Sequence, residues 1–292
     1  MTATTPTRHR DRPARPTSKL TFGGVLRSEV IKLRTLRSTW WCLSIMVVII
    51  VGFGALFALS AGLFQAGEAS TEQQQQIVAQ SVSVGVVFGQ LVASILGALV
   101  ITGEFGTGMI RSTFATVPKR LPAVVAKLVV VALTLFVVSL VALVLTLLIN
   151  SAILPSNDIT VDFGDGALWR SVVGAAASIA FIGMIAFSLG AIIRNGAGAI
   201  AASVGLVFVL PIIVQIFTAF VDAAWVYTLA EIIPPNAAAR LYDYVVSGQS
   251  AMALPSPDGA LVLEPWSALL VLVGWVVVLF GLALALVKRR DV

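Results

Sequence analysis

The residues that could do chemistry are few and widely spaced. The chain has one histidine, His9, in a polar N-terminal stretch, and one cysteine, Cys42, inside an apolar run. No G-x-x-x-x-G-K-[ST], G-x-S-x-G or H-E-x-x-H pattern occurs, and no pair of carboxylates or row of ionisable residues falls inside an apolar segment. The sequence therefore predicts no active site, no bound metal or cofactor and no ion-coupling site.

The segment richest in turn-forming and charged residues is 103–127, which reads GEFGTGMIRSTFATVPKRLPAVVAK. Its glycines break the preceding apolar helix, Thr107 is expected to cap a short new helix, and Pro118 is expected to end it. The apolar stripe of that helix consists of Met109, Ile110, Thr113, Phe114 and Val117. The pattern fits both a helix that presents an apolar surface to a soluble partner and one that lies on a membrane.

The elements that must position this segment are apolar helices. Of the 292 residues, 58% are hydrophobic and 11% are charged, whereas a soluble domain carries about 25% charged residues. This composition excludes a soluble enzyme and a disordered chain. Each apolar segment has about 20–25 residues, enough to cross a bilayer as a helix. We therefore predict an all-α polytopic membrane protein with six transmembrane helices, near 40–64, 82–102, 128–148, 171–193, 197–220 and 266–287.

The N-terminal region divides into two parts. Residues 1–21 form a basic tail, expected to be disordered and cytoplasmic, with no role in nucleic-acid binding. Residues 22–39 have helical periodicity with a basic polar face that includes Arg34, which predicts an amphipathic helix at the membrane interface. Glu29 intrudes near its apolar face and is expected to pair with Lys32 three residues later. Residues 22–292 then form a single membrane domain.

The charge distribution predicts the orientation. Six spans place 17 of the 19 Lys and Arg residues on the side that holds both termini, and ten of the 14 acidic residues on the other side. Cytoplasmic enrichment of Lys and Arg is the rule for membrane proteins, so both termini are expected in the cytoplasm. The longest outer loop, 221–265, is moderately apolar in its first part, 222–246, where we expect short helices.

Polar residues inside the spans allow two interpretations. Gln90 and Ser94 lie one turn apart, and Gln215 follows Pro211 by one turn. Such residues either line a translocation path or hydrogen-bond to a neighbouring helix. The motifs Gly85-x-x-x-Gly89 and Gly174-x-x-x-Ser178 predict close helix contacts.

The loop sequence resembles a known family. Its pattern G-E-x-x-x-G-(M/I)-x-x-x-T-x-x-x-x-P-x-R, followed by A-K, is similar to permease subunits of the type-2 exporter family of ATP-binding-cassette transporters (ABC-2 type permeases). The matching residues are Gly103, Glu104, Gly108, Met109, Thr113, Pro118, Arg120, Ala126 and Lys127. The opening segment Ser28–Trp40 and the order of surface helix, six spans and long last outer loop are also similar, so the resemblance covers about residues 22–290.

This resemblance implies a function and its partners. The chain would be the permease of an exporter in a bacterial inner membrane, paired with a second permease copy or a homologue. A separate P-loop ATPase subunit would bind ATP and Mg²⁺, so the chain itself would not be an enzyme. Segment 104–118 would be the coupling helix, and the surface helix with Glu29, Lys32 and Arg34 would also meet the ATPase. The coupling residues implied are Glu104 where span two ends, the apolar contacts Met109, Ile110 and Phe114, and the charged rim Arg111, Lys119 and Arg120.

Two other classes of function are compatible with the sequence. One is a carrier or channel that works without ATP, which is expected to show ion-coupling charges or an internal repeat. The other is a non-transporting immunity or sensory protein that binds a ligand at loop 221–265. The transported substrate, and the choice between homodimer and heterodimer, stay open.

Overall fold

The computed structural model of the chain describes residues 21–64, 70–109, 120–221, 223–246, 249–250 and 259–289. Residues 1–20 of the predicted basic tail lie outside this part. The described elements are α1 (Phe22–Thr35), α2 (Arg37–Phe64), α3 (Thr71–Ser83), α4 (Val86–Gly106), α6 (Arg120–Ile153), the 3₁₀ helix η1 (Leu154–Asn157), α7 (Gly166–Ile193), α8 (Gly196–Val204), the π-helix η2 (Gly205–Val209), α9 (Leu210–Phe220), α10 (Ala224–Ile232), α11 (Pro234–Tyr242), the strands β1 (Val245–Val246) and β2 (Gln249–Ser250), and α12 (Pro265–Arg289).

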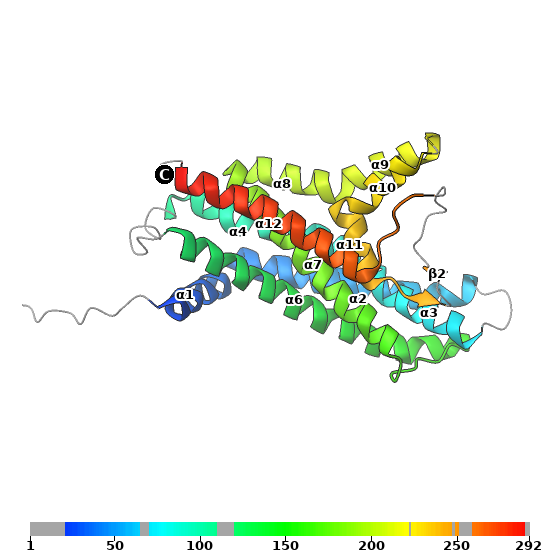
Figure 1. Cartoon of the computed structure of the whole chain (residues 1–292). Coiled ribbons are helices and arrows are strands. Elements are labelled where there is room, and N and C mark those ends of the chain that lie inside the picture. Colours follow the sequence, from blue (N-terminus) through cyan, green and yellow to red (C-terminus); the bar gives the residue numbers. More distant parts are fainter. Residues whose placement is uncertain are drawn as a thin grey trace, which may run out of the picture.

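Six helical stretches are long and apolar enough to cross a membrane, which confirms the predicted all-α architecture and makes the chain an integral membrane protein. Helix α1 and the C-terminal end of α12 lie at one end of the bundle, called here the α1 end, and α3 and β2 lie at the opposite end (Figure 1). The helices extend beyond their predicted bounds: α4 runs to Gly106 and α6 begins at Arg120. The connection between spans two and three is therefore shorter than the predicted 103–127, and Glu104 belongs to α4.

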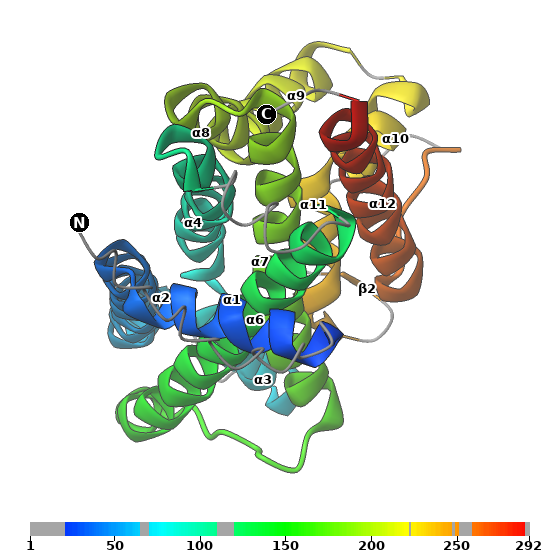
Figure 2. The same ribbon diagram turned by 90° about the vertical axis from the view of Figure 1, so that its left-hand side faces the viewer.

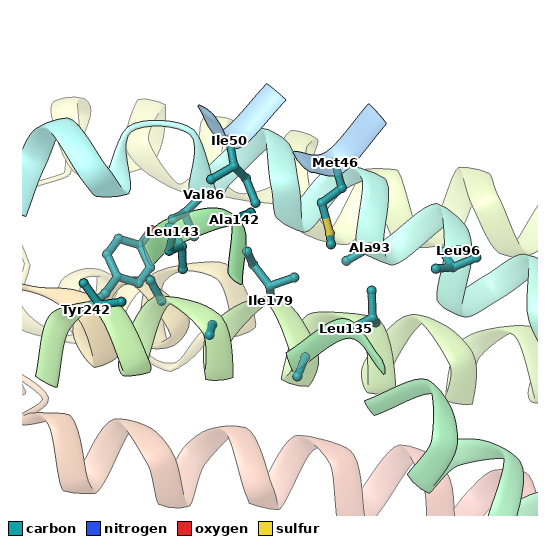
Figure 3. Packing of buried hydrophobic residues seen from close by; sticks show 14 of the residues in the cluster. Met46, Ile50, Val86, Ala93, Leu96, Leu135, Ala142, Leu143, Ile179 and Tyr242 are labelled. Atoms are coloured by element: carbon teal, nitrogen blue, oxygen red, sulfur yellow. The ribbon is translucent and has the colours of Figure 1, made fainter. Parts of the chain in front are cut away.

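Helix α7 forms the centre of the bundle (Figure 2). It contacts α4, α6, α11 and α12. In the most apolar 18-residue stretch of α7, 67% is buried inside the protein, whereas the corresponding value for the fifth span, 196–220, is 11%. Apolar side chains of α2, α4, α6 and α7 fill the space around it (Figure 3). The largest buried members include Met46, Ile50, Leu135, Leu143 and Ile179.

Small residues let these helices approach closely. A Cβ atom added at Gly97 of α4 would collide with the carbonyl oxygen of Gly183 on α7. One added at Gly174 of α7 would collide with the carbonyl oxygen of Leu241 on α11. At Gly85 the added atom would lie 2.7 Å from the Cα of Ile50. The close contacts predicted for the two small-residue motifs are therefore confirmed.

The fifth span contains an irregular turn. Pro211 has no N–H, so the carbonyl of Val207 loses its ordinary helical donor. The chain widens into a π-helix over Gly205–Val209, and the N–H of Leu210 bonds to the carbonyl of Gly205. Such turns commonly lie next to proline in helices. The predicted span 197–220 is thus continuous in sequence but divided into α8, η2 and α9.

Two short helices, α10 and α11, follow the fifth span, as predicted for residues 222–246. Arg240 of α11 pairs with Glu231 of α10, and its Nη1 lies 3.4 Å from Oδ2 of Asp243. The indole of Trp275 on α12 donates to the carbonyl of Ile232 at 2.9 Å. These contacts fasten α10 and α11 to the bundle; the pair β1 and β2 that follows is antiparallel, with Val245 opposite Ser250.

Candidate functional site

Helix α1 lies across the α1 end of the bundle over α6 (Figure 2). Thr21 caps its N-terminus by accepting a hydrogen bond from the backbone N–H of Gly24. Its buried face consists of Val25, Glu29 and Leu33, which confirms the predicted amphipathic helix. The helix stops at Leu36, whose N–H bonds to the carbonyl of Lys32, and the chain turns directly into α2. Glu29, a charged residue on the otherwise apolar face of α1, therefore lies inside the bundle.

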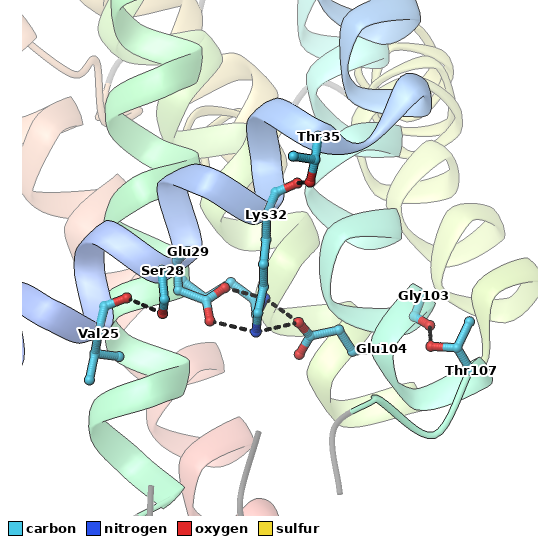
Figure 4. Close-up of polar contacts among 9 residues, drawn as sticks. Val25, Ser28, Glu29, Lys32, Thr35, Gly103, Glu104 and Thr107 are labelled. Carbon is cyan, nitrogen blue, oxygen red and sulfur yellow. Dashed lines mark hydrogen bonds and ion pairs between the residues drawn. The ribbon is translucent and has the colours of Figure 1, made fainter. Parts of the chain in front are cut away.

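Four charged side chains meet where α1 crosses the ends of α4 and α6 (Figure 4). Lys32 Nζ lies 2.9 Å from Oε1 of Glu29 and 3.1 Å from Oε1 of Glu104. Lys127 Nζ on α6 lies 2.5 Å from Oε2 of Glu29 and 2.7 Å from Oε1 of Glu104. Each ammonium group contacts both carboxylates, so the cluster Glu29–Lys32–Glu104–Lys127 connects three helices. We call it the ion cluster.

The ion cluster is buried and balanced in charge. Glu29, Lys127 and Glu104 are 3%, 5% and 7% exposed, and only Lys32 reaches solvent substantially. Burial alone would lower the pKa of Lys32, but the hydrogen bond to Glu29 and the charges of Glu104 and Glu29 outweigh burial and raise it above the ordinary lysine value. Lys32 is therefore protonated at physiological pH. Two positive and two negative groups then satisfy one another away from water.

The ion cluster brings together three of the residues selected from the sequence. The predicted i,i+3 pair of Glu29 and Lys32 is confirmed. Glu104 joins this pair, although 72 residues separate it from Lys32. Arg34 is exposed and lies outside the cluster; its backbone carbonyl accepts a hydrogen bond from the indole of Trp40 at 2.8 Å.

The connection after α4 is only partly described. Thr107 follows the last residue of α4, and its hydroxyl donates to the carbonyl of Gly103 at 2.8 Å. The helix that Thr107 is predicted to cap lies outside the described residues, so that role stays a prediction. The backbone turns at Gly108 with φ +70°, and Met109 is 42% exposed. Ile110, Arg111, Phe114 and Lys119 lie outside the described residues, and of Arg120 only the backbone at the start of α6 is described. The coupling role of these residues stays a prediction.

Two residues of this end were missed as site residues in the sequence. Lys127 was noted only as part of a motif, although a lysine inside an apolar run is itself a signal of buried pairing. Arg194 ends α7 in the left-handed conformation, with φ 58°. Its Nη2 lies 3.3 Å from the carbonyl of Leu286 on α12, and its guanidinium lies 5.1 Å from the ring centre of Phe105 on α4. Arg194 therefore connects α4, α7 and α12.

The polar residues of the spans have different surroundings. Gln90 is buried and donates from Nε2 to Oγ of Ser178 on α7 at 3.1 Å. Ser94 is buried, and its hydroxyl donates to the carbonyl of Leu91. Gln215 is exposed and lines a cavity of about 250 Å³ between α9 and the α10–α11 pair. Gln90 thus makes the helix-to-helix bond that was one of its two predicted roles; a role of these three residues in a path stays a prediction.

No group of three or more His, Cys, Asp or Glu residues that could hold a metal ion occurs among the described residues. That the chain binds no cofactor of its own stays a prediction.

The model of a family described as ABC-2 family transporter protein matches residues 24–292, which include all but the first two residues of α1 and every later helix. No curated protein gives a match.

Proposed function

The chain belongs to the ABC-2 family of transporter proteins and is the permease of an ABC transporter, and we propose that it works as an exporter driven by a separate ATPase subunit. ATP and Mg²⁺ would bind to that partner. Two permeases, either two copies of this chain or this chain and a homologue, would form the path between them. The substrate is moved by motion of helices, and the chain itself makes no covalent bond.

The ion cluster is the observation that supports this mechanism. It fastens α1, α4 and α6 to one another at the point where the chain leaves α4 toward α6. A force applied to the connection between α4 and α6 would therefore act on three helices together, because the side chains that join them are buried and paired. Rigid-body tilting of packed helices is a standard means of transmitting a change at one site to a distant one.

The position and chemistry of the connection suit an ATPase partner. Met109 offers an exposed apolar side chain three residues after α4 ends, and Arg34 and Arg37 give the neighbouring junction of α1 and α2 a basic rim. An apolar contact surrounded by charged rim residues is the usual composition of a protein interface. The coupling residues predicted from the sequence, 110–119, would extend this surface.

The distribution of charge supports the orientation. The segments that lead into or out of the α1 end carry most of the Lys and Arg residues, which supports our proposal that this end faces the cytoplasm of a bacterium, with the protein in its inner membrane. Both termini would be cytoplasmic, and α10 and α11 would lie on the outer side. Export is proposed because the family resembled consists mostly of exporters and no segment for capturing an external solute is evident in the sequence.

Purification of the tagged chain from its native membrane in mild detergent, with mass spectrometry of its partners, tests this proposal. We expect a P-loop ATPase at near equimolar amount, lost on Met109→Glu or Phe114→Glu. Phe163→Glu is the matched control, because Phe163 is about as exposed as Met109 but lies at the end of the bundle opposite the α1 end. A chain that purifies alone and transports in liposomes without ATP would instead establish the carrier alternative.

A further inference from the structure

The turn between α10 and α11 lies deep along the last span. We call the end of the bundle opposite the α1 end the outer end, as in the proposed orientation (Figure 1). Trp266 is 77% exposed where α12 begins at this end, as is typical of aromatic residues at a membrane surface. Trp275, whose indole bonds to Ile232 at the end of α10, follows about 14 Å further along the helix. Since a hydrocarbon core is about 30 Å thick, the α10–α11 pair reaches nearly to its middle.

The cavity of about 250 Å³ between α9 and this pair lies in the outer half of the bilayer. Gln215 of α9 lines it, about 8 Å before the helix ends at Phe220. Glu231 of α10 and Asn236 and Arg240 of α11 line it from the other side. Polar and charged side chains therefore meet around one cavity at a depth where a lipid-facing helix presents apolar groups.

The polar groups of the cavity are satisfied to different extents. Arg240 is 6% exposed, donates from Nε to Oε2 of Glu231 at 2.9 Å and contacts the other carboxylate oxygen through Nη2. Nδ2 of Asn236 donates to the carbonyl of Ala230 at 2.8 Å. Gln215 is exposed, and its side-chain amide makes no hydrogen bond within the part of the chain that the structure describes. An amide in this position is costly unless the cavity supplies a partner.

Water suits this cavity better than a lipid chain does. A cavity with polar walls holds water when each molecule finds two to four partners, whereas an apolar cavity stays dry. The amide of Gln215 offers both donors and acceptors, and the carboxylate of Glu231 has more acceptor positions than the two that Arg240 uses. The volume has room for several water molecules. An acyl chain in the same space would leave these groups without partners.

We propose that this cavity is a water-filled vestibule, open to the outer side, that reaches nearly to the middle of the bilayer. Helix α9, at the periphery of the bundle, forms its outer wall (Figure 2), and the contact of η2 with α11 closes its inner end. In a permease this vestibule would be the outer part of the route for the polar portion of a substrate. That role rests on the proposed function, whereas the hydration of the cavity does not.

Labelling of engineered cysteines with a charged, membrane-impermeant methanethiosulfonate tests the hydration. Cys42→Ala gives a background without thiols, because Cys42 is the only cysteine of the chain. Gln215→Cys places a thiol in the cavity, and Ile216→Cys is the matched control, because Ile216 is 53% exposed at nearly the same depth but does not line the cavity. The reacting form is the thiolate, which hydrocarbon disfavours, so we expect Gln215→Cys to react at least about tenfold faster.

The reagent is added separately to each side of sealed membrane vesicles, and Phe163→Cys identifies the side on which the outer end lies. If Gln215→Cys is as slow as Ile216→Cys on that side, the proposal is overturned, because lipid or a neighbouring chain then fills the cavity. Equally fast reaction of the two would also overturn it, because water would then reach α9 outside the cavity. The assay needs neither ATP nor an ATPase, so its outcome is separate from that of the proposed function.

Filling the cavity tests whether it is the route by which water reaches Gln215. Ala239→Phe places an aromatic ring in the cavity and is expected to slow the labelling of Gln215→Cys toward the rate of Ile216→Cys. Ala219→Phe is the control, because Ala219 is exposed on α9 and does not line the cavity. Equal labelling rates of Gln215→Cys with Ala239→Phe and with Ala219→Phe would overturn the proposed route.

Discussion

Lys127 is the most buried cation of the ion cluster, and its removal gives a sharp test of the arrangement. In Lys127→Met the side chain keeps most of its apolar length but loses the ammonium group that contacts Glu29 and Glu104. Lys32 alone would then face two buried carboxylates. One negative charge is left uncompensated at the junction of three helices, so α1 is expected to detach from α4 and α6 more easily.

The magnitude follows from the burial of the partners. Removing one member of a buried ion pair costs about 3–5 kcal/mol, because the remaining charge stays desolvated. Lys32 still balances one carboxylate and is partly exposed, so a cost near the lower limit, about 3 kcal/mol, is expected. For a domain of roughly this size, 1 kcal/mol shifts the unfolding temperature by about 2–4 °C, which predicts a decrease of roughly 6–12 °C.

Thermal unfolding of the detergent-solubilised chain, followed by circular dichroism, measures this shift. Lys288→Met is the matched control, because Lys288 is exposed near the end of α12 and is expected to change the unfolding temperature by less than about 2 °C. Equal shifts in the two variants would refute the reasoning. In the double variant Glu104→Gln with Lys127→Met, one carboxylate and one ammonium are lost together, so the combined cost is expected to be smaller than the sum of the two single costs.

Three further perturbations test other parts of the structure. Gly174→Val is expected to separate α7 from α11, because the valine side chain would collide with the α11 backbone. The measurement is the yield of monodisperse protein, compared with that of Gly52→Val, where the added side chain meets open space. Gln90→Leu is expected to cost about 1 kcal/mol by leaving the hydroxyl of Ser178 without its donor, and adding Ser178→Ala is expected to recover part of it in the same thermal assay. Because the pKa of Lys32 is raised above the ordinary lysine value of 10.5, its contribution to stability is fully present below pH 10.5 and is lost as the pH rises beyond that value. The difference in unfolding temperature between wild type and Lys32→Met is therefore expected to stay constant from neutral pH to just below pH 10.5. A difference that shrinks at mildly alkaline pH would contradict the pairing.

The number and type of the spans could be predicted because hydropathy over twenty residues is a strong signal. The central position of α7 could not be predicted, because a helix that is apolar on all sides has no periodic pattern that distinguishes a surface facing protein from one facing lipid. The π-helix before Pro211 was missed for another reason. Proline in a membrane helix signals an irregularity, but neighbouring turns can accommodate the missing donor in several ways.

The ion cluster shows a similar division between local and distant contacts. The pair of Glu29 and Lys32 could be predicted because three residues separate them on one helix. The participation of Lys127, 98 residues from Glu29, depends on how α1 crosses α6, and spacing in the sequence does not encode a crossing angle. The buried hydroxyl of Thr39, which has no hydrogen-bond partner among the described residues, could not be predicted for the same reason, since only the assembled bundle decides which polar atoms lose water.

The sparse burial of the fifth span has a consequence for how the protomer deforms. Helix α8 packs against α4 and α7, but α9 has no buried residue, and the π-helix between the two departs from the ordinary α-helical hydrogen-bond pattern. The free energy needed to open a segment falls with the number of contacts it breaks. Hydrogen exchange is therefore expected to be fastest here among the spans and slowest in α7. The molecule thus has a rigid central helix, α7, and a more deformable fifth span at its side. Any large motion is therefore expected to change mainly the contacts between the fifth span and the lipid or protein around it.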